Sequence, residues 1–389
     1  MDPIAPMLEA VLQEVREDTS GAVADYIPQL AAAPPDRLAF AVVGPRGHVF
    51  SVGDDEVAFT IQSVSKPFVL ALALERLGRD AVFARVGVEP SGEPFNAISL
   101  EAGTGRPANP MVNAGAIATS GLAAEGSAAE RSSTLRDTLS RFAGRSLSID
   151  EEVYLGESET GHRNRALAHL LRSHGIIDGD VTTVVETYFR QCSILVTVRD
   201  LSVMAATLAF GGVNPVTGER VVREAVARDV VSVMASCGMY DYSGEWMLRV
   251  GMPAKSGVSG DLMAIAPSQF GVATFSPRLD RHGNSVRGIR VLERLSEEFG
   301  MHVFEPHESI AEPGIRIERT DGAVIVHLGG ELAFSGAARV VGVLRDLTGA
   351  DSESDVLVDA SALARAHPAA LSVLRAQLET EGGRLHFTQ

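Results

Sequence analysis

The sequence predicts an α+β protein made of two units joined by a short linker. Strand-like runs occur before residue 63 and after residue 261, and long helical patterns fill the sequence between them. A segment that carries Pro and Gly, 305–313, precedes a region where strand and helix patterns alternate. Strands that flank a block of helices are typical of α+β units, and alternation is typical of α/β units. We therefore expect a first unit over 1–304 and a small α/β unit over 314–389.

The first unit should open with a helix and a β-hairpin. Apolar residues recur at helical spacing between residues 8 and 15, which predicts an amphipathic helix. Two apolar runs, 38–43 and 48–52, flank the turn sequence Gly-Pro-Arg-Gly at 44–47. Apolar runs on either side of such a turn predict two antiparallel strands.

A strand over 59–63 should lead into an apolar helix over 63–77. Pro67 falls in the first turn of this helix, where its missing N–H costs nothing, and Gly78 ends it. Ser63 and Lys66 are three residues apart, so they should be neighbours on one helical face. Ser63 also lies at the helix N-terminus, where the positive end of the helix dipole favours an anion.

The rest of the chain is mainly helical up to residue 245 and mixed beyond it. We expect helices over much of 110–245, with loops at 156–161 and 211–215. Two antiparallel strands and a closing helix should follow, at 262–266, 271–275 and 291–298. In the second unit the predicted strands are 315–319, 323–328, 356–359 and 384–387, and the predicted helices are 335–348 and 368–381.

Composition excludes several classes of protein. The apolar content of 45% supports a full core, and the net charge of −16 argues against a nucleic-acid partner. Cys192 and Cys237 give no disulfide framework, and the ten histidines show no metal-ligand spacing. The N-terminus lacks the features of a signal peptide, and no apolar run approaches the ~18 residues of a membrane span. We therefore expect a cytoplasmic protein with no membrane anchor and no metal.

The two lysines are the strongest pointer to chemistry. Against thirty-two arginines the chain has only Lys66 and Lys255. A buried ammonium can lose its proton near neutral pH, whereas a guanidinium cannot. Ser63-Val64-Ser65-Lys66 is an S-x-x-K pattern, and Lys255-Ser256-Gly257 is similar to the K-T-G element of serine acyl-transfer enzymes. The alternative is that an Arg-biased composition left two lysines at these places by accident.

Six segments in one order carry a family resemblance. They are Gln62-Ser63-Val64-Ser65-Lys66, Asn109 to Ile117, Arg163-Asn164, Tyr188 to Ser193, Cys237 to Asp241 and Pro253 to Val258. Together they resemble the serine-dependent glutaminase family, whose fold is similar to that of β-lactamases and penicillin-binding proteins. The resemblance implies a β-lactamase-like first unit, an antiparallel sheet with helices. The chain departs from the family at Ser259-Gly260-Asp261, where more glycines are usual, and we expect this to alter the loop beside the oxyanion site.

The resemblance also implies roles for individual residues. Ser63 matches the nucleophile, Lys66 the base that activates it, and Tyr240 a proton relay beside both. The backbone N–H groups of Ser63 and Val258 match the oxyanion donors, and Lys255, Ser256 and Gly257 support the site. The residues that match a glutamine site are Tyr26, Ser63, Asn113, Glu157, Asn164, Tyr188, Tyr240 and Val258.

These roles agree with what the reaction requires. Amide hydrolysis needs an activated hydroxyl, a proton donor for ammonia and two donors for the oxyanion. A free amino acid adds an ammonium, which a carboxylate such as Glu157 could bind, and a carboxylate, which Asn113 and Asn164 could bind. Each residue also has a structural alternative: Glu157 as a solvated loop acid, the asparagines as turn or cap residues, and Tyr188 as a core aromatic.

The second unit resembles a STAS domain, the fold of anti-sigma-factor antagonists, through the run from Val356 to Ser361. The phosphorylated hydroxyl of that family should fall within 366–370, where this chain has no Ser or Thr. We therefore expect the unit to act by binding a protein partner; the alternative is an inert appended domain.

The sequence thus predicts a glutaminase that converts L-glutamine and water to L-glutamate and ammonia, with no cofactor. We also expect a homo-oligomer, a dimer or a tetramer. Two rival functions remain. One is a penicillin-recognising serine hydrolase, disfavoured because the chain lacks an S-D-N element. The other is a catalytically poor glutamine sensor that signals through the STAS-like unit.

Overall fold

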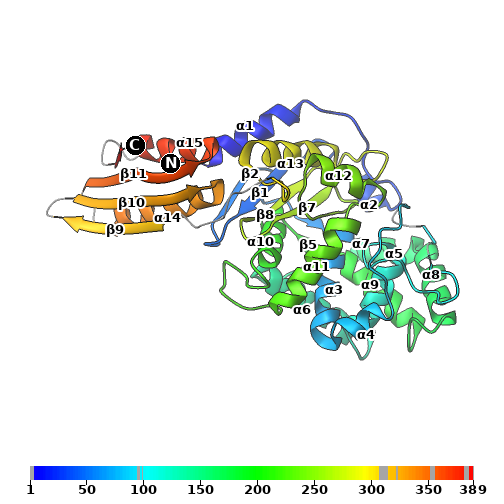
Figure 1. The fold of residues 1–389 in the computed structure, drawn as a ribbon. Helices are drawn as coiled ribbons and strands as arrows, with labels where there is room; N and C mark the ends of the chain where they lie inside the picture. Colours follow the sequence, from blue (N-terminus) through cyan, green and yellow to red (C-terminus); the bar gives the residue numbers. More distant parts are fainter. Residues whose placement is uncertain are drawn as a thin grey trace.

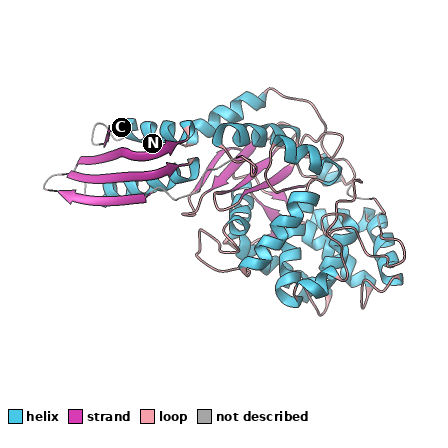
Figure 2. Ribbon diagram, in the orientation of Figure 1, coloured by secondary structure: helices cyan, strands magenta, loops and turns pink. Residues whose placement is uncertain are grey.

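The chain folds into helices and three β-sheets, as expected of an α+β protein (Figures 1 and 2). The computed structural model describes residues 4–93, 97–98, 100–305, 314–320, 323–350, 355–380 and 385–388. The predicted linker at 305–313 lies outside the described residues except for Glu305. Within the described part of the chain, no helix is both long and apolar enough to cross a membrane.

An antiparallel sheet joins the two ends of the first unit. Its strand order is β2-β1-β8-β7-β6, and Ala39 pairs with Phe275 across the long sequence gap. The strands are β1 (Ala39–Val43), β2 (Val49–Gly53), β6 (Ala254–Ser256), β7 (Asp261–Ala266) and β8 (Phe270–Phe275). The predicted hairpin and the later strand pair are confirmed. Sequence reasoning missed β6, which is too short to show a period.

Helices cover both faces of this sheet (Figure 1). Phe40 and Val42 point to one face, where they pack with α1 (Ala5–Arg16) and α13 (Val286–Phe299). Ala39 and Ala41 point to the other, which is covered by α3 (Lys66–Leu77) and α10 (Val198–Ala209). This alternation has the period of two expected of a strand.

The rest of the first unit is mainly helical, and most of it lies on the same side of the large sheet as α3 (Figure 1). Its helices are α2 (Pro28–Ala31), α4 (Arg79–Phe83), α5 (Asn113–Ala123), α6 (Ala128–Ala143), α7 (Glu151–Thr160), α8 (His162–Ser173), α9 (Val181–Cys192), α11 (Glu224–Cys237) and α12 (Ser243–Arg249). A small sheet of order β3-β5-β4 runs beside them, with β3 (Phe59–Thr60), β4 (Ser148–Ile149) and β5 (Ile194–Val196).

Two predictions in this region were wrong. The helix expected from residue 63 begins at Lys66, and a 3₁₀ turn, η1 (Gln62–Ser65), precedes it. The loop expected at 156–161 is mostly the end of α7, whose N-cap residue Asp150 accepts hydrogen bonds from two backbone N–H groups. Gly156 lies inside this helix, and a Cβ there would lie 2.6 Å from the side-chain oxygen of Gln29, which would have to move. The loop at 211–215 is confirmed, since α10 ends at Ala209.

The second unit alternates strands and helices as predicted. Its sheet has the order β12-β11-β10-β9, in which β9 is antiparallel to β10 and the other pairs are parallel. The elements are β9 (Gly314–Thr320), β10 (Ala323–Leu332), α14 (Phe334–Ala350), β11 (Asp355–Ala366), α15 (Pro368–Thr380) and β12 (Leu385–Thr388).

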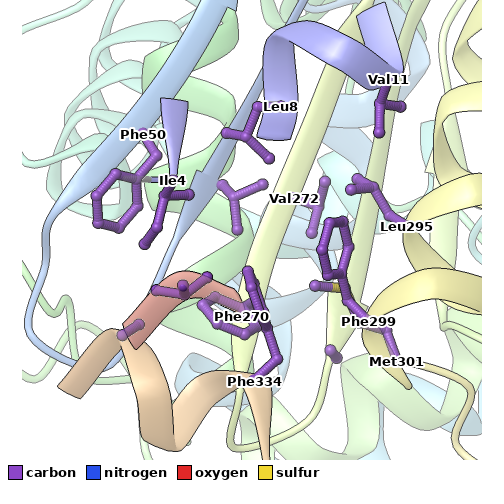
Figure 3. Packing of buried hydrophobic residues seen from close by; sticks show 14 of the residues in the cluster. Ile4, Leu8, Val11, Phe50, Phe270, Val272, Leu295, Phe299, Met301 and Phe334 are labelled. Carbon is purple, nitrogen blue, oxygen red and sulfur yellow. The ribbon is translucent and has the colours of Figure 1, made fainter. Parts of the chain in front are cut away.

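The two units share one apolar cluster, which the sequence did not predict. Phe334, at the start of α14, lies against two rings of the first unit, with ring centroids 4.4 Å from Phe299 and 5.5 Å from Phe270 (Figure 3). Ile4 and Met301 belong to the same buried cluster. The second unit is therefore docked on the edge of the first unit's core.

Candidate active site

A cavity of about 370 Å³ lies among the helices at the start of α3. Most of its lining residues have polar side chains, and they come from η1, α5, α7, α8 and α9 and from the non-helical segments at Tyr26, Gly161 and Val258. The lining residues are Tyr26, Gln62, Ser63, Asn113, Glu157, Thr160, Gly161, Arg163, Asn164, Tyr188, Cys192 and Val258. The structure thus brings seven of the predicted substrate-site residues to one cavity, and it places Lys66, Tyr240 and Lys255 behind that wall.

A tight turn holds Ser63 at the cavity. Gln62, just before it, adopts a φ of 43°, a region that residues other than glycine rarely occupy. The Gln62 side chain braces this conformation: its amide donates to Thr60 Oγ1 at 3.3 Å and its oxygen accepts from the Tyr26 hydroxyl at 3.4 Å. Local strain that surrounding contacts maintain is common where a side chain must be aimed at a ligand.

Lys66, three residues after Ser63, is buried and has neutral partners. Only 1% of the residue is exposed, and its Nζ donates to Asn113 Oδ1 at 2.8 Å and to Met111 O at 3.1 Å. Burial lowers the pKa of Lys66 to about 7, partly opposed by Cys192 and Glu157. In the neutral amine these two bonds use both N–H groups, so the lone pair remains available as a base. Among the residues that the structure describes, no hydrogen bond joins Lys66 to Ser63.

Tyr240 connects Ser63 to the second lysine. It begins the 3₁₀ turn η2 (Tyr240–Tyr242) with a φ of 55°, and its hydroxyl accepts a hydrogen bond from Lys255 Nζ at 2.7 Å. A hydrogen bond also links it to Ser63, while burial raises the pKa of the phenol well above its usual range. The Nζ of Lys255 lies 3.9 Å and that of Lys66 5.6 Å from the Tyr240 ring centroid. The phenol is therefore placed to pass protons between the serine and the lysines.

The loop after β6 brings a second backbone donor to Ser63. Val258 lies in this loop, and no described backbone carbonyl accepts from its N–H. Ser259 ties the loop to β3, since its hydroxyl donates to Thr60 O at 2.7 Å. The N–H of Ser63 precedes the first hydrogen bond of η1, from Val64 N to Ile61 O. Among the described residues neither N–H has a backbone acceptor, and both residues line the cavity, as the two donors of an oxyanion site would.

Glu157 forms the acidic end of the cavity. It is only 6% exposed, so the interpretation as a solvated loop acid is wrong. The Tyr26 hydroxyl donates to its Oε1 at 3.0 Å. Burial raises the pKa of Glu157, while hydrogen bonds from Tyr26 and Gln62 and the charge of Lys66 oppose that shift. A buried carboxylate with few partners in an open cavity is suited to an external cation.

Two asparagines and a tyrosine form a hydrogen-bonded chain along the wall. Asn113 Nδ2 donates to Asn164 Oδ1 at 3.1 Å, and the Tyr188 hydroxyl donates to Asn113 Oδ1 at 3.3 Å. Asn113 therefore also holds Lys66, a link that sequence reasoning did not anticipate. Tyr188 is buried, but its hydroxyl reaches the cavity wall, so it is more than a core aromatic.

Several lining residues had no assigned role in the sequence analysis. Gln62, Arg163 and Cys192 lie within the quoted motifs, which was the available signal, and Thr160 had none. Burial raises the pKa of the Cys192 thiol to about 12, so it lines the cavity as a neutral group. Within the described ranges, no three His, Cys, Asp or Glu side chains gather in a way that could hold a metal ion.

A family model described as Glutaminase matches residues 21–304 of the chain. The chain belongs to the glutaminase family. It is 53% identical over 301 residues to "Glutaminase 1" of Bradyrhizobium diazoefficiens, a match that covers 77% of this chain and 49% of that protein. It therefore spans about half the length of that relative. A glutaminase of Trichormus variabilis is 49% identical over 303 residues, which cover 78% of this chain and 91% of that protein.

Solved structures extend the similarity to the whole chain. The crystal structure of Mglu in its glutamate form has a TM-score of 0.78 and 38% sequence identity, and the match covers 100% of this chain and 99% of that one. The similarity to Mglu therefore covers both units of this glutaminase-family chain.

Proposed function

We propose that this glutaminase-family chain hydrolyses L-glutamine to L-glutamate and ammonia through an acyl-enzyme on Ser63. One observation carries the proposal: a single cavity has at one side a serine, hydrogen-bonded to a phenol that lies beside two buried lysines, and at the other side a buried carboxylate. The crystal structure of Mglu in its glutamate form supports the same substrate class, because glutamate is the product of this reaction.

The first half of the reaction forms the acyl-enzyme. The Ser63 oxygen attacks the side-chain amide carbon, and its proton passes to the base, Lys66, directly or through Tyr240. The N–H groups of Ser63 and Val258 stabilise the oxyanion. The protonated base then gives its proton to the amide nitrogen, the C–N bond breaks and ammonia leaves.

The second half releases glutamate. A water molecule gives a proton to the neutral base and attacks the acyl carbon, and the C–O bond to Ser63 breaks as the serine recovers its proton. Lys66 suits both halves because its pKa of about 7 leaves the base and acid forms equally populated near neutral pH.

The ends of the substrate match the two polar groups of the wall. Glu157, oriented by Tyr26, binds the α-ammonium, and Asn164, with Tyr188 and Asn113, binds the α-carboxylate. The side-chain amide of glutamine then extends toward Ser63. Because the cavity binds both the α-ammonium and the α-carboxylate, we expect free glutamine to be preferred over peptides that contain it.

A coupled glutamate assay on the purified protein tests this function against its rivals. Glutamate release from glutamine supports the proposal, whereas binding of glutamine without turnover would indicate the sensor. Hydrolysis of a penicillin but not of glutamine would indicate the penicillin-recognising enzyme. The family comparisons favour neither rival.

We propose further that residues 314–389 form a STAS-like unit that regulates the enzyme by binding a protein. The strand and helix order supports a STAS-like fold. The segment that should bear the phosphorylated hydroxyl begins α15 with Pro368, Ala369 and Ala370, none of which can be phosphorylated. Mass spectrometry of the protein from cells tests this, and a phosphate between Arg365 and Leu374 would contradict it.

We also propose that the protein is a homo-oligomer, a dimer or a tetramer. Light scattering in solution would measure its mass.

A further inference from the structure

Asp261 is a buried acid to which the proposed chemistry gives no task. It is the first residue of β7, is 0% exposed, and neither carboxylate oxygen has a hydrogen-bond partner among the described residues. Burying a carboxyl group without a partner is destabilising, and strongly so when it is ionised. A residue of this kind is retained only where its charge compensates another buried charge or its chemistry is needed.

The register of the sheet places Asp261 on the same face as Lys255. Lys255 pairs with Met263 across the β6–β7 ladder, and Asp261 lies two residues before Met263. Because side chains alternate with a period of two, all three point to one side of the sheet. The carboxylate lies directly over Gly257, where an added Cβ would stand 2.1 Å from Asp261 Oδ1. Only glycine at 257 leaves room for it.

The opposite charges of Asp261 and Lys255 act on each other. Burial raises the pKa of Asp261 and lowers that of Lys255, and their mutual attraction opposes both shifts. Lys66 further lowers the pKa of Lys255 by like-charge repulsion. Among the described residues the two groups do not form an ion pair within 4 Å, so their attraction acts without direct contact.

We propose that Asp261 is a positioning residue that keeps Lys255 protonated and thereby orients the phenol of Tyr240 toward Ser63. Lys255 Nζ donates to Tyr240 Oη and to Ser256 O, each at 2.7 Å. If Lys255 always donates to the oxygen of the phenol, the phenol's own proton remains available for a hydrogen bond with Ser63. The inference rests on the proposed function, because it assigns Asp261 a part in that reaction.

A charged Lys255 also favours a neutral Lys66. Both ammonium groups lie over the same Tyr240 ring, so a proton on one makes a proton on the other less favourable. Among the described residues, the other titratable groups around this set are Tyr26, Glu157 from α7, Tyr188 and Cys192 from α9, and Tyr240 itself. Asp261 therefore acts on the base of the reaction through Lys255 without touching the substrate.

The variant Asp261→Asn removes the charge and keeps the shape. Without the carboxylate, Lys255 loses its proton at lower pH. The alkaline limb of the plot of kcat against pH should therefore shift to lower pH. Lys66 is then repelled less and holds its own proton to higher pH, so the acid limb should shift to higher pH. The pH profile should narrow from both sides, kcat at the optimum should fall about tenfold or more, and KM should change little.

Three further measurements separate this role from a merely structural one. In a Tyr240→Phe background the effect of Asp261→Asn on kcat should largely disappear, because the group it orients is gone. Asp200→Asn is the matched control: it also removes a buried acid, paired with Arg145 away from the cavity, and should lower the melting temperature without moving either limb. If Asp261→Asn does not fold, Asp261→Gly removes both the charge and the buried oxygens and carries the same expectation.

Folded Asp261 variants whose two pH limbs coincide with those of the wild type would overturn the role of Asp261. A wild-type protein that releases no ammonia from glutamine would instead overturn the proposed function. The two failures are therefore distinguishable in the same experiment.

Discussion

Replacing Lys66 by Arg should abolish the base while keeping a positive charge. Lys66 is 1% exposed, and its pKa of about 7 means that about half the molecules carry a neutral amine at pH 7. Arginine keeps its proton, since its pKa exceeds about 12, so about one guanidinium in 10⁵ would be neutral at that pH. The population of the basic form thus falls by about 10⁴ to 10⁵.

The expected loss in kcat for Lys66→Arg is therefore about 10⁴-fold, close to the floor set by the oxyanion donors and substrate binding alone. The wild type should lose activity about tenfold for each pH unit below a pKa of about 7, because the base becomes protonated. Lys66→Arg should show no such limb. The measurement is ammonia release from glutamine between pH 5 and pH 9.

Lys66→Ala is the companion variant. It should lose as much activity as the Arg variant, but a small primary amine added to the buffer should restore part of it, because the amine can occupy the vacated space and act as a base. The Arg variant should not respond, since its guanidinium fills that space. An Arg variant with most of the wild-type kcat would refute the reasoning and point to another base.

Three other changes test the rest of the site and the second unit. Ser63→Ala should lower kcat by about 10⁴-fold or more, and labelling by a glutamine-derived electrophile, followed by mass spectrometry, should be lost with it; labelling elsewhere would contradict the assignment. Glu157→Gln should weaken glutamine binding by about 1.5–3 kcal/mol, and an unchanged KM would return Glu157 to a structural role. A chain that ends at Glu312 should keep glutaminase activity but melt at a lower temperature, because Phe270 and Phe299 lose the cover of Phe334; loss of folding would make the second unit an obligate part of the core.

The retention of activity in that shortened chain follows from where the cavity lies. Every lining residue precedes residue 259, and the family match ends at residue 304. The Trichormus relative is covered over 91% of its length by a match to 78% of this chain, so little of that protein lies outside the match. The apolar contact through Phe334 is thus expected to affect stability more than chemistry.

Local patterns predicted the elements that bear the reactive groups. The spacing of Ser63 and Lys66 and the run around Lys255 predicted that these residues would meet, and the structure brings them together around Tyr240. The start of α3 was misplaced because Gln62 has a φ that helix propensity does not anticipate. Such a conformation depends on side-chain contacts from distant residues.

The second error, the loop predicted at 156–161, has a tertiary cause. Two glycines and a serine normally favour a turn, but the Asp150 cap starts a helix there, and the side chain of the distant Gln29 donates to Glu152 O in its first turn. This helix is what buries Glu157. The contact of Phe334 with Phe270 was equally beyond local patterns, because it joins segments whose relative position no periodicity encodes.

Arginine and lysine occupy different kinds of site in this chain, and the difference is whether the side chain must be able to lose its proton. Among the described residues, each ion pair that a Lys or Arg forms uses an arginine, mostly at the surface, and neither lysine takes part in one. Both lysines instead donate to neutral oxygens around one phenol, with Glu157 and Asp261 as the buried acids nearby. In that setting a small change in environment decides which lysine holds a proton. Both lysines thus lie where the proposed reaction transfers protons, and arginine is found in the ion pairs, which need only a permanent positive charge.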